Sequence, residues 1–150
     1  MIEPELVVAG FALLGTVALG LVVHEWTHAV VLRLGGIDYA IAYAPNRGPG
    51  VLGVLASCPW AVVRPRPTGR EPAWVLRCAA LAPLVLAVPV FLVGVAGDGR
   101  LASPMATAIA IGWLACSLPS PQDFSVAFYA HRALEDRRRR IAATPSSRAD

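Results

Sequence analysis

The sequence predicts an α-helical polytopic membrane protein, with about three transmembrane helices and a small β-hairpin or sheet between the first and the second. Hydrophobic residues make up 56% of the 150-residue chain and charged residues only 15%, with a mean hydropathy of +0.58. This composition is too apolar for an ordinary soluble domain. The apolar residues also gather into three runs, two of which exceed the roughly 20 residues that a helix needs to cross a membrane.

The first predicted span covers residues 6–34. It is apolar or small throughout, apart from Arg33 and the motif HEWTH at residues 24–28. Gly35-Gly36 is a natural helix stop. The residues before the span carry acidic but no basic side chains, so a cleaved signal peptide is not expected.

Residues 37–63 differ in character and are expected to form the surface strands. Residues 38–43 alternate weakly, residues 45–50 are dense in turn residues, and residues 51–56 and 61–63 favour β-structure. The open edge of such a strand can bind an extended peptide by strand addition. The alternative is a loop that only connects two spans.

The second predicted span covers residues 73–95 and the third, shorter one covers residues 102–118. Pro83 and Pro89 interrupt the backbone hydrogen bonds of the second span. Membrane helices tolerate such breaks when neighbouring groups bond to the freed carbonyls.

The chain then continues as a charged helix, residues 121–141, and a polar tail, residues 142–150, that is expected to be disordered. Residues 1–141 are therefore interpreted as a single integral membrane domain. All 13 basic residues are arginines, and five of them lie between Arg132 and Arg140. A basic segment can bind nucleic acid, but we interpret this one as a cytoplasmic flank beside anionic membrane lipid and predict no nucleic-acid partner.

The arginines also predict the orientation in the membrane. In a three-span arrangement only Arg100 lies on one side, and the other side holds the C-terminal cluster together with Arg33, Arg47, Arg64, Arg66 and Arg70. The positive-inside rule places the N-terminus outside and the C-terminus in the cytoplasm. The motif at residues 24–28 then lies near the cytoplasmic face, where the third span also ends. The sequence predicts no particular oligomeric state.

The motif itself predicts a metal site. His24 and His28 are four residues apart, so they lie on one face of a helix and can bind a single ion. Glu25 is rotated by about 100° from His24, and the H-E-x-x-H pattern assigns it as the general base beside a zinc ion. The alternative, an accidental pair of core histidines, leaves an unpaired Glu25 in the membrane, which is costly. Gly20 and Thr16 precede the motif by one and two turns and allow another helix to approach closely.

A third zinc ligand must come from elsewhere, because hydrolytic zinc sites usually have three protein ligands. Asp123 is the acidic residue that reaches the right depth, just after a helix end that prolines break. It also fits a capping box with Ser120 at the start of the last helix. His131, two turns later among charged residues, is the rival ligand. Cys58, Cys78 and Cys116 form no C-x-x-C pair, so we predict no disulfide and treat them as packing residues.

Together these residues resemble the site-2 protease clan, and most closely its short zincin peptidase membrane domains. The resemblance spans most of residues 20–130 and consists of HEWTH in the first span, Ala80-Leu-Ala-Pro83 in the second and an Asp after the third. It implies His24, His28 and Asp123 as zinc ligands, Glu25 as general base and strands that present the substrate. The chain departs from the larger proteases, because Pro121-Gln-Asp123 replaces their Asn-Pro-Asp-Gly motif and no PDZ domain fits.

The sequence therefore predicts a membrane-embedded zinc metalloprotease with one Zn²⁺, whose substrate is a membrane protein or peptide. A non-proteolytic membrane protein that keeps the zinc for structural or scaffolding purposes is the alternative. Metal transport is a less well supported function, since the other predicted spans lack the series of polar groups that would carry an ion across the membrane.

Overall fold

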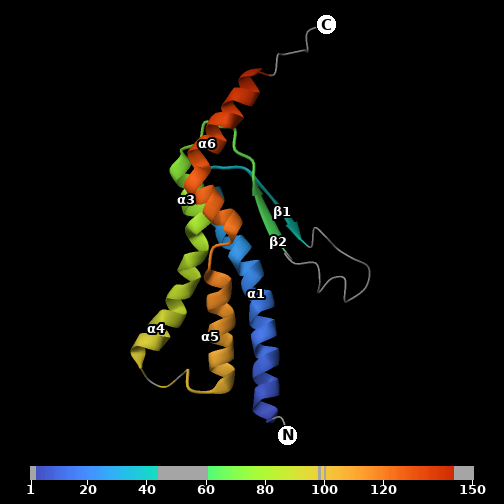
Figure 1. Cartoon of the computed structure of the whole chain (residues 1–150), viewed down its shortest axis with the longest axis vertical. Helices are drawn as coiled ribbons and strands as arrows, with labels where there is room; N and C mark the ends of the chain where they lie inside the picture. Colours follow the sequence, from blue (N-terminus) through green and yellow to red (C-terminus); the bar gives the residue numbers. More distant parts are fainter. Residues whose placement is uncertain (1–2, 44–60, 98, 100, 144–150) are drawn as a thin grey trace, which may run out of the picture.

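The computed structural model describes residues 3–43, 61–97, 99 and 101–143, and this part of the chain is mostly helical. Its elements are α1 (Pro4–Leu34), β1 (Tyr39–Tyr43), β2 (Ala61–Pro65), α3 (Ala73–Leu81), the 3₁₀ segment η1 (Ala82–Ala87), α4 (Val88–Ala96), α5 (Pro104–Ser117) and α6 (Pro121–Ala143). Helices α1, α4 and α5 reach one end of the molecule, and α6 extends past the others at the opposite end (Figure 1). The β-prone residues 51–56 and most of the expected disordered tail lie outside the described residues.

Helix α1 ends where the glycine pair predicts. Gly36 adopts a φ of 68°, its N–H donates to the Arg33 carbonyl, and the Ile37 N–H donates to the Leu32 carbonyl. This is the Schellman pattern, which satisfies carbonyls that the last turn leaves free. Leu32 and Ile37 are both buried, in a core cluster that joins the end of α1 to α3 and α6.

The second span is a helical run with a 3₁₀ interruption, as its prolines predict. Segment η1 separates α3 from α4, and Pro83 lies in its first turn. Proline carries no backbone N–H, so Pro83 cannot bond to the carbonyl of Ala79 four residues earlier.

The third predicted span, residues 102–118, is shorter than a full span. It forms α5, whose 14 residues begin after Ser103, which caps the Ala106 N–H. The helix ends because the residue before a proline avoids the helical region: Leu118, which precedes Pro119, has ψ at 130°. At 1.5 Å per residue the helix is roughly 21 Å long, short of a bilayer core of about 30 Å.

Two helices in the described part of the chain are long and apolar enough to cross a membrane, Pro4–Leu34 and Ala73–Ala96. Only 11% and 22% of their most apolar windows are buried, whereas the core helix of a soluble protein is mostly buried. Large apolar side chains such as Phe11, Leu14 and Phe91 are exposed instead. An exposed apolar surface of this kind fits contact with lipid.

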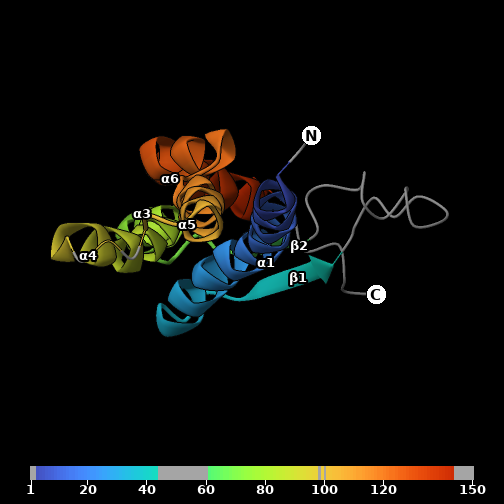
Figure 2. The same cartoon turned by 90° about the horizontal axis from the view of Figure 1, so that it is seen from below.

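Helix α5 lies along α1 (Figures 1 and 2). A Cβ added at Gly20 would lie 2.8 Å from the Cβ of Cys116, and one added at Gly112 would lie 3.3 Å from the Cβ of Thr16. These small residues let the two backbones approach, which confirms the expectation drawn from Gly20 and Thr16. The close crossing brings the end of α5 beside His24.

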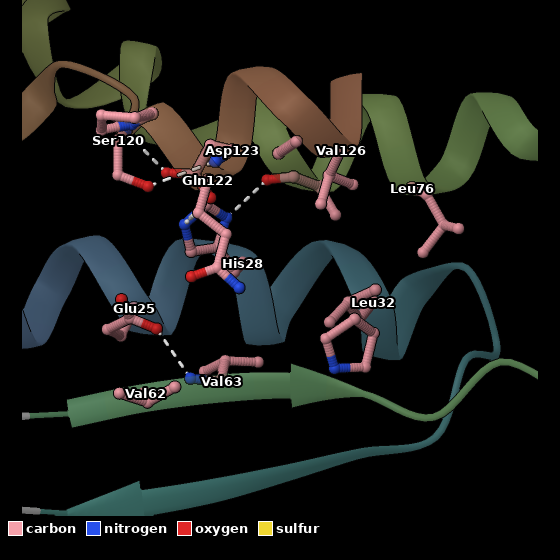
Figure 3. Close-up of a pocket in the computed structure, with 14 residues that line it drawn as sticks. Glu25, His28, Leu32, Val62, Val63, Leu76, Ser120, Gln122, Asp123 and Val126 are labelled. Atoms are coloured by element: carbon pink, nitrogen blue, oxygen red, sulfur yellow. Dashed lines mark hydrogen bonds and ion pairs between the residues drawn. The ribbon is translucent and has the colours of Figure 1, made fainter. Parts of the chain in front are cut away.

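Strands β1 and β2 form a two-stranded antiparallel sheet in which Ile41 pairs with Val63. Strand β2 lies between α1 and β1 (Figure 3). Hydrogen bonds fix the loop between β2 and α3. Glu71 accepts from the Thr68 and Gly69 amides within the loop, and the Gly69 carbonyl accepts from Arg138 of α6. Slight burial raises the pKa of Glu71, but the hydrogen bonds outweigh it and lower the pKa to about 2.

Candidate metal centre

His24 and His28 lie on the same face of α1 and are both buried, with 7% and 8% of their surface exposed. Their ring centroids are 4.9 Å apart. The four-residue spacing places the rings one turn apart on the helix, so the structure confirms that the two imidazoles face a common space.

Each histidine is oriented by a backbone carbonyl. His24 Nδ1 lies 2.7 Å from the Cys116 carbonyl oxygen, and His28 Nδ1 lies 2.7 Å from that of Ala79. A carbonyl can only accept, so both Nδ1 atoms carry a proton, and in the neutral imidazoles both Nε2 atoms present a lone pair. Metal-binding histidines show this second hydrogen bond almost always, because it fixes the tautomer and the ring.

Both carbonyls are available because the helices around them stop making regular bonds. Ala79 lies four residues before Pro83, which has no N–H to donate, and its carbonyl accepts from Ala82 and His28. Cys116 lies in the last turn of α5, where carbonyls have no partner within the helix. The prolines thus create the acceptors that orient the histidines.

Asp123 reaches the same space from the first turn of α6. Its Oδ2 is 3.5 Å from His24 Nε2 and its Oδ1 is 3.3 Å from His28 Nε2. Figure 3 shows Asp123 beside His28. Asp123 Oδ2 also accepts the Ser120 N–H, while the Asp123 N–H donates to Ser120 Oγ. Asp123 therefore completes a capping box and also faces both histidines. The two roles, which are alternatives in the interpretation of the sequence, occur together in the structure.

These distances match ligands around one tetrahedral ion. Two ligand atoms about 2.1 Å from an ion, at about 109°, lie about 3.4 Å from each other. In addition, His28 Nε2 is buried without a hydrogen-bond partner. Lone pairs facing a carboxylate need a proton or a cation between them, and two neighbouring buried imidazolium ions would be costly. The donor set therefore fits a divalent metal ion.

Glu25 lies beside the histidines but points toward the sheet. A carboxylate oxygen of Glu25 and one nitrogen of each histidine lie within 4.8 Å of one another. Its Oε2 accepts the backbone N–H of Val63 in β2 at 2.7 Å (Figure 3). Glu25 is thus held at the side of the site that faces β2, whereas Asp123 approaches from α6.

The rival ligand His131 lies away from this site. Its side chain is 70% exposed, and its Nε2 lies 3.0 Å from a carboxylate oxygen of Glu135. Cys116 contributes its carbonyl and not its thiol, which points to the Val17 carbonyl at 3.5 Å. Cys78 is exposed, and Cys58 lies outside the described residues.

A cavity of about 440 Å³ opens beside the site. Polar groups line it around the metal centre, and apolar residues line it further along α1, where Leu32 lies one turn after His28. Its lining includes Glu25, His28, Asp123, Ser120 and Gln122 at the polar end and Leu32, Leu76, Val126, Val62 and Val63 elsewhere.

Reasoning from the sequence missed the Val63 amide and the carbonyls of Ala79 and Cys116. The prolines signal that carbonyls are freed, but they do not identify the partner. Comparisons with protein-family models, with curated proteins and with solved structures give no match to this chain.

Proposed function

We propose that this chain is a membrane-embedded zinc metallopeptidase that hydrolyses peptide bonds in or beside the membrane. The observation that supports it best is the approach of Asp123 to both histidine Nε2 atoms, at 3.5 and 3.3 Å. This spacing suits three ligands on one ion, and the resemblance to the site-2 protease clan points to the same residues.

In this proposal His24, His28 and Asp123 hold the zinc. Zinc bound to three protein ligands leaves a position for water or substrate, polarises a carbonyl and lowers the pKa of a bound water toward about 7. The Glu25 carboxylate takes a proton from the water molecule whose oxygen attacks the scissile carbonyl, and passes that proton to the leaving amine as the C–N bond breaks. Its place beside the histidines, and not among the groups that contact both Nε2 atoms, supports the base role.

The substrate is a membrane protein or peptide, presented as an extended segment. Val62, Val63 and Pro65 of β2 line the cavity together with Glu25 and Asp123, so a peptide beside β2 would lie over the metal centre. Strand addition supplies backbone hydrogen bonds that do not depend on the side chains of the peptide.

The zinc requirement has a direct test. Purified protein in detergent micelles should contain about one zinc per chain by elemental analysis and cleave members of a fluorogenic peptide pool. Dialysis against a chelator should abolish cleavage, and added Zn²⁺ should restore it, because the ligands are preorganised by the bonds to Cys116 and Ala79. Cleavage that survives complete removal of the metal would contradict the proposal.

We also propose that the protein is polytopic, with its N-terminus outside and its C-terminus and metal centre toward the cytoplasm. Arg33 lies in the last turn of α1, Arg64, Arg66 and Arg70 lie between α1 and α3, and the other arginines of this side lie in α6. All of them follow His28 or the end of α5 along the chain, on the side of the metal centre. Because basic flanks remain in the cytoplasm, a reporter fused after residue 143 should be active there and a tag ahead of α1 should be accessible from outside. A cytoplasmic N-terminal tag would contradict this orientation.

A further inference from the structure

The edge of β2 that faces the metal centre has few backbone donors. Antiparallel strands direct alternate residues to the partner and to the opposite edge. The Arg66 N–H donates to the Asp38 carbonyl next to β1, so the amides of Arg64 and Val62 point to β1 as well. Ala61, Val63 and Pro65 therefore point to the other edge, and Pro65 has no N–H.

Of the two amides on this edge, that of Val63 is hydrogen-bonded to Glu25, the proposed general base. Its N–H donates to Glu25 Oε2 at 2.7 Å, across 38 residues of sequence. A hydrogen bond to a carboxylate is stronger than one to a neutral acceptor. Val63 lies at the middle of the five-residue strand β2 and also lines the cavity, so a peptide added to this edge in register would need the same N–H.

We propose that Glu25 and the substrate compete for the Val63 amide, so that Glu25 is latched to β2 until an extended peptide docks there and releases it. A carbonyl of the peptide takes over the Val63 N–H, and the freed Glu25 carboxylate becomes available beside the histidines. This inference rests on the proposed peptidase function. It implies that the base is fully available only when a peptide is in place.

The latch has a thermodynamic signature that needs no catalysis. In metal-free protein in detergent micelles, a neutral probe, fluorophore-labelled Val-Ala-Val-Ala-Val-amide, should bind about tenfold or more tightly to Glu25→Ala than to the wild type, because hydrogen bonds to charged groups are among the stronger ones in proteins. Glu25→Gln is the matched control: it removes the same charge, but its amide oxygen still accepts from Val63. Because a neutral acceptor bonds more weakly than a carboxylate, the affinity of Glu25→Gln should lie between those of the wild type and Glu25→Ala.

Substitutions at Val63, which donates the hydrogen bond, test the same competition from the other partner. Val63→Pro removes the N–H, so it should weaken binding of the probe, and Glu25→Ala should give no gain on that background. Val63→Ala also truncates a side chain of the cavity lining but keeps the N–H, so Glu25→Ala should still increase affinity on this background. Hydrogen exchange at the Val63 amide reports the same contact without a backbone substitution: protected in the wild type, exposed in Glu25→Ala, and protected again when the probe binds.

Equal affinity of the probe for wild type, Glu25→Ala and Glu25→Gln, or no binding to any of them, would overturn the latch. Equal gains in Glu25→Ala and Glu25→Gln would also overturn it, because charge alone would then explain the effect. These outcomes are separate from the failure of the proposed function, which is the absence of cleavage by zinc-loaded protein. If the zinc-loaded protein cleaved no peptide but the variants bound the probe as expected, the competition for the Val63 amide would stand and the proposed peptidase function would fail.

Discussion

Glu25→Gln protein should keep about one zinc per chain and lose peptidase activity by about 10²- to 10⁴-fold, the usual contribution of a general base. The substitution preserves size, and the glutamine oxygen can still accept the Val63 N–H that now bonds to Glu25 Oε2. It cannot take up a proton at neutral pH. The structural effect should therefore be small and the chemical effect large, which elemental analysis and a cleavage assay on the same sample can separate.

The control for this experiment is His28→Ala, which should lose metal and activity together, because it removes a buried nitrogen facing Asp123. Unchanged activity in Glu25→Gln would exclude the base role. Loss of metal in Glu25→Gln would instead identify Glu25 as a fourth ligand. A zinc ion with four protein ligands has no open position for water, so this result would favour the non-proteolytic alternative.

Asp123→Ala should lower zinc affinity by more than about 100-fold, as severely as His28→Ala. Substitution of groups that merely orient a metal ligand already costs about 10- to 100-fold, and Asp123 contacts both Nε2 atoms itself. Competition with a chromophoric chelator on purified protein measures this affinity. His131→Ala should bind zinc like the wild type, because its imidazole is exposed and paired with Glu135.

The capping role of Asp123 needs its own control, and Ser120→Ala supplies it. This variant removes the hydroxyl that accepts the Asp123 N–H and leaves the carboxylate in place. It should cost about 1 kcal/mol of stability, visible as a lower melting temperature, with zinc affinity near that of the wild type. Full zinc in Asp123→Ala together with depleted zinc in His131→Ala would reverse the assignment of the third ligand.

Several features of the fold follow from local sequence. The glycine pair after residue 34 ends α1 through the positive φ of Gly36, and Pro83 converts the middle of the second span into a 3₁₀ segment. Pro119 stops α5 one residue earlier than a continuous apolar run would suggest. In each case a backbone preference acts within one helical turn, so no knowledge of the tertiary structure is needed.

Residue types and spacing also determined half of the candidate site. His24 and His28 share a face because four residues make slightly more than one turn, and the same rotation puts Glu25 at their side. The length of the third helix was harder to predict from hydropathy, because Ser103 and Pro119 set its two ends: the predicted span of residues 102–118 contains a helix of 14 residues, Pro104–Ser117.

Only the tertiary structure decided what meets these histidines. Asp123 and His131 are both on α6, and the way α6 packs on α3 turns the first toward His24 and leaves the second in the open. The Cys116 carbonyl reaches His24 because Gly20 allows α5 to approach α1, and the Val63 amide reaches Glu25 because β2 lies against α1. Spacing along a helix is a local property, whereas these contacts join residues 38 to 99 positions apart and depend on how the elements cross.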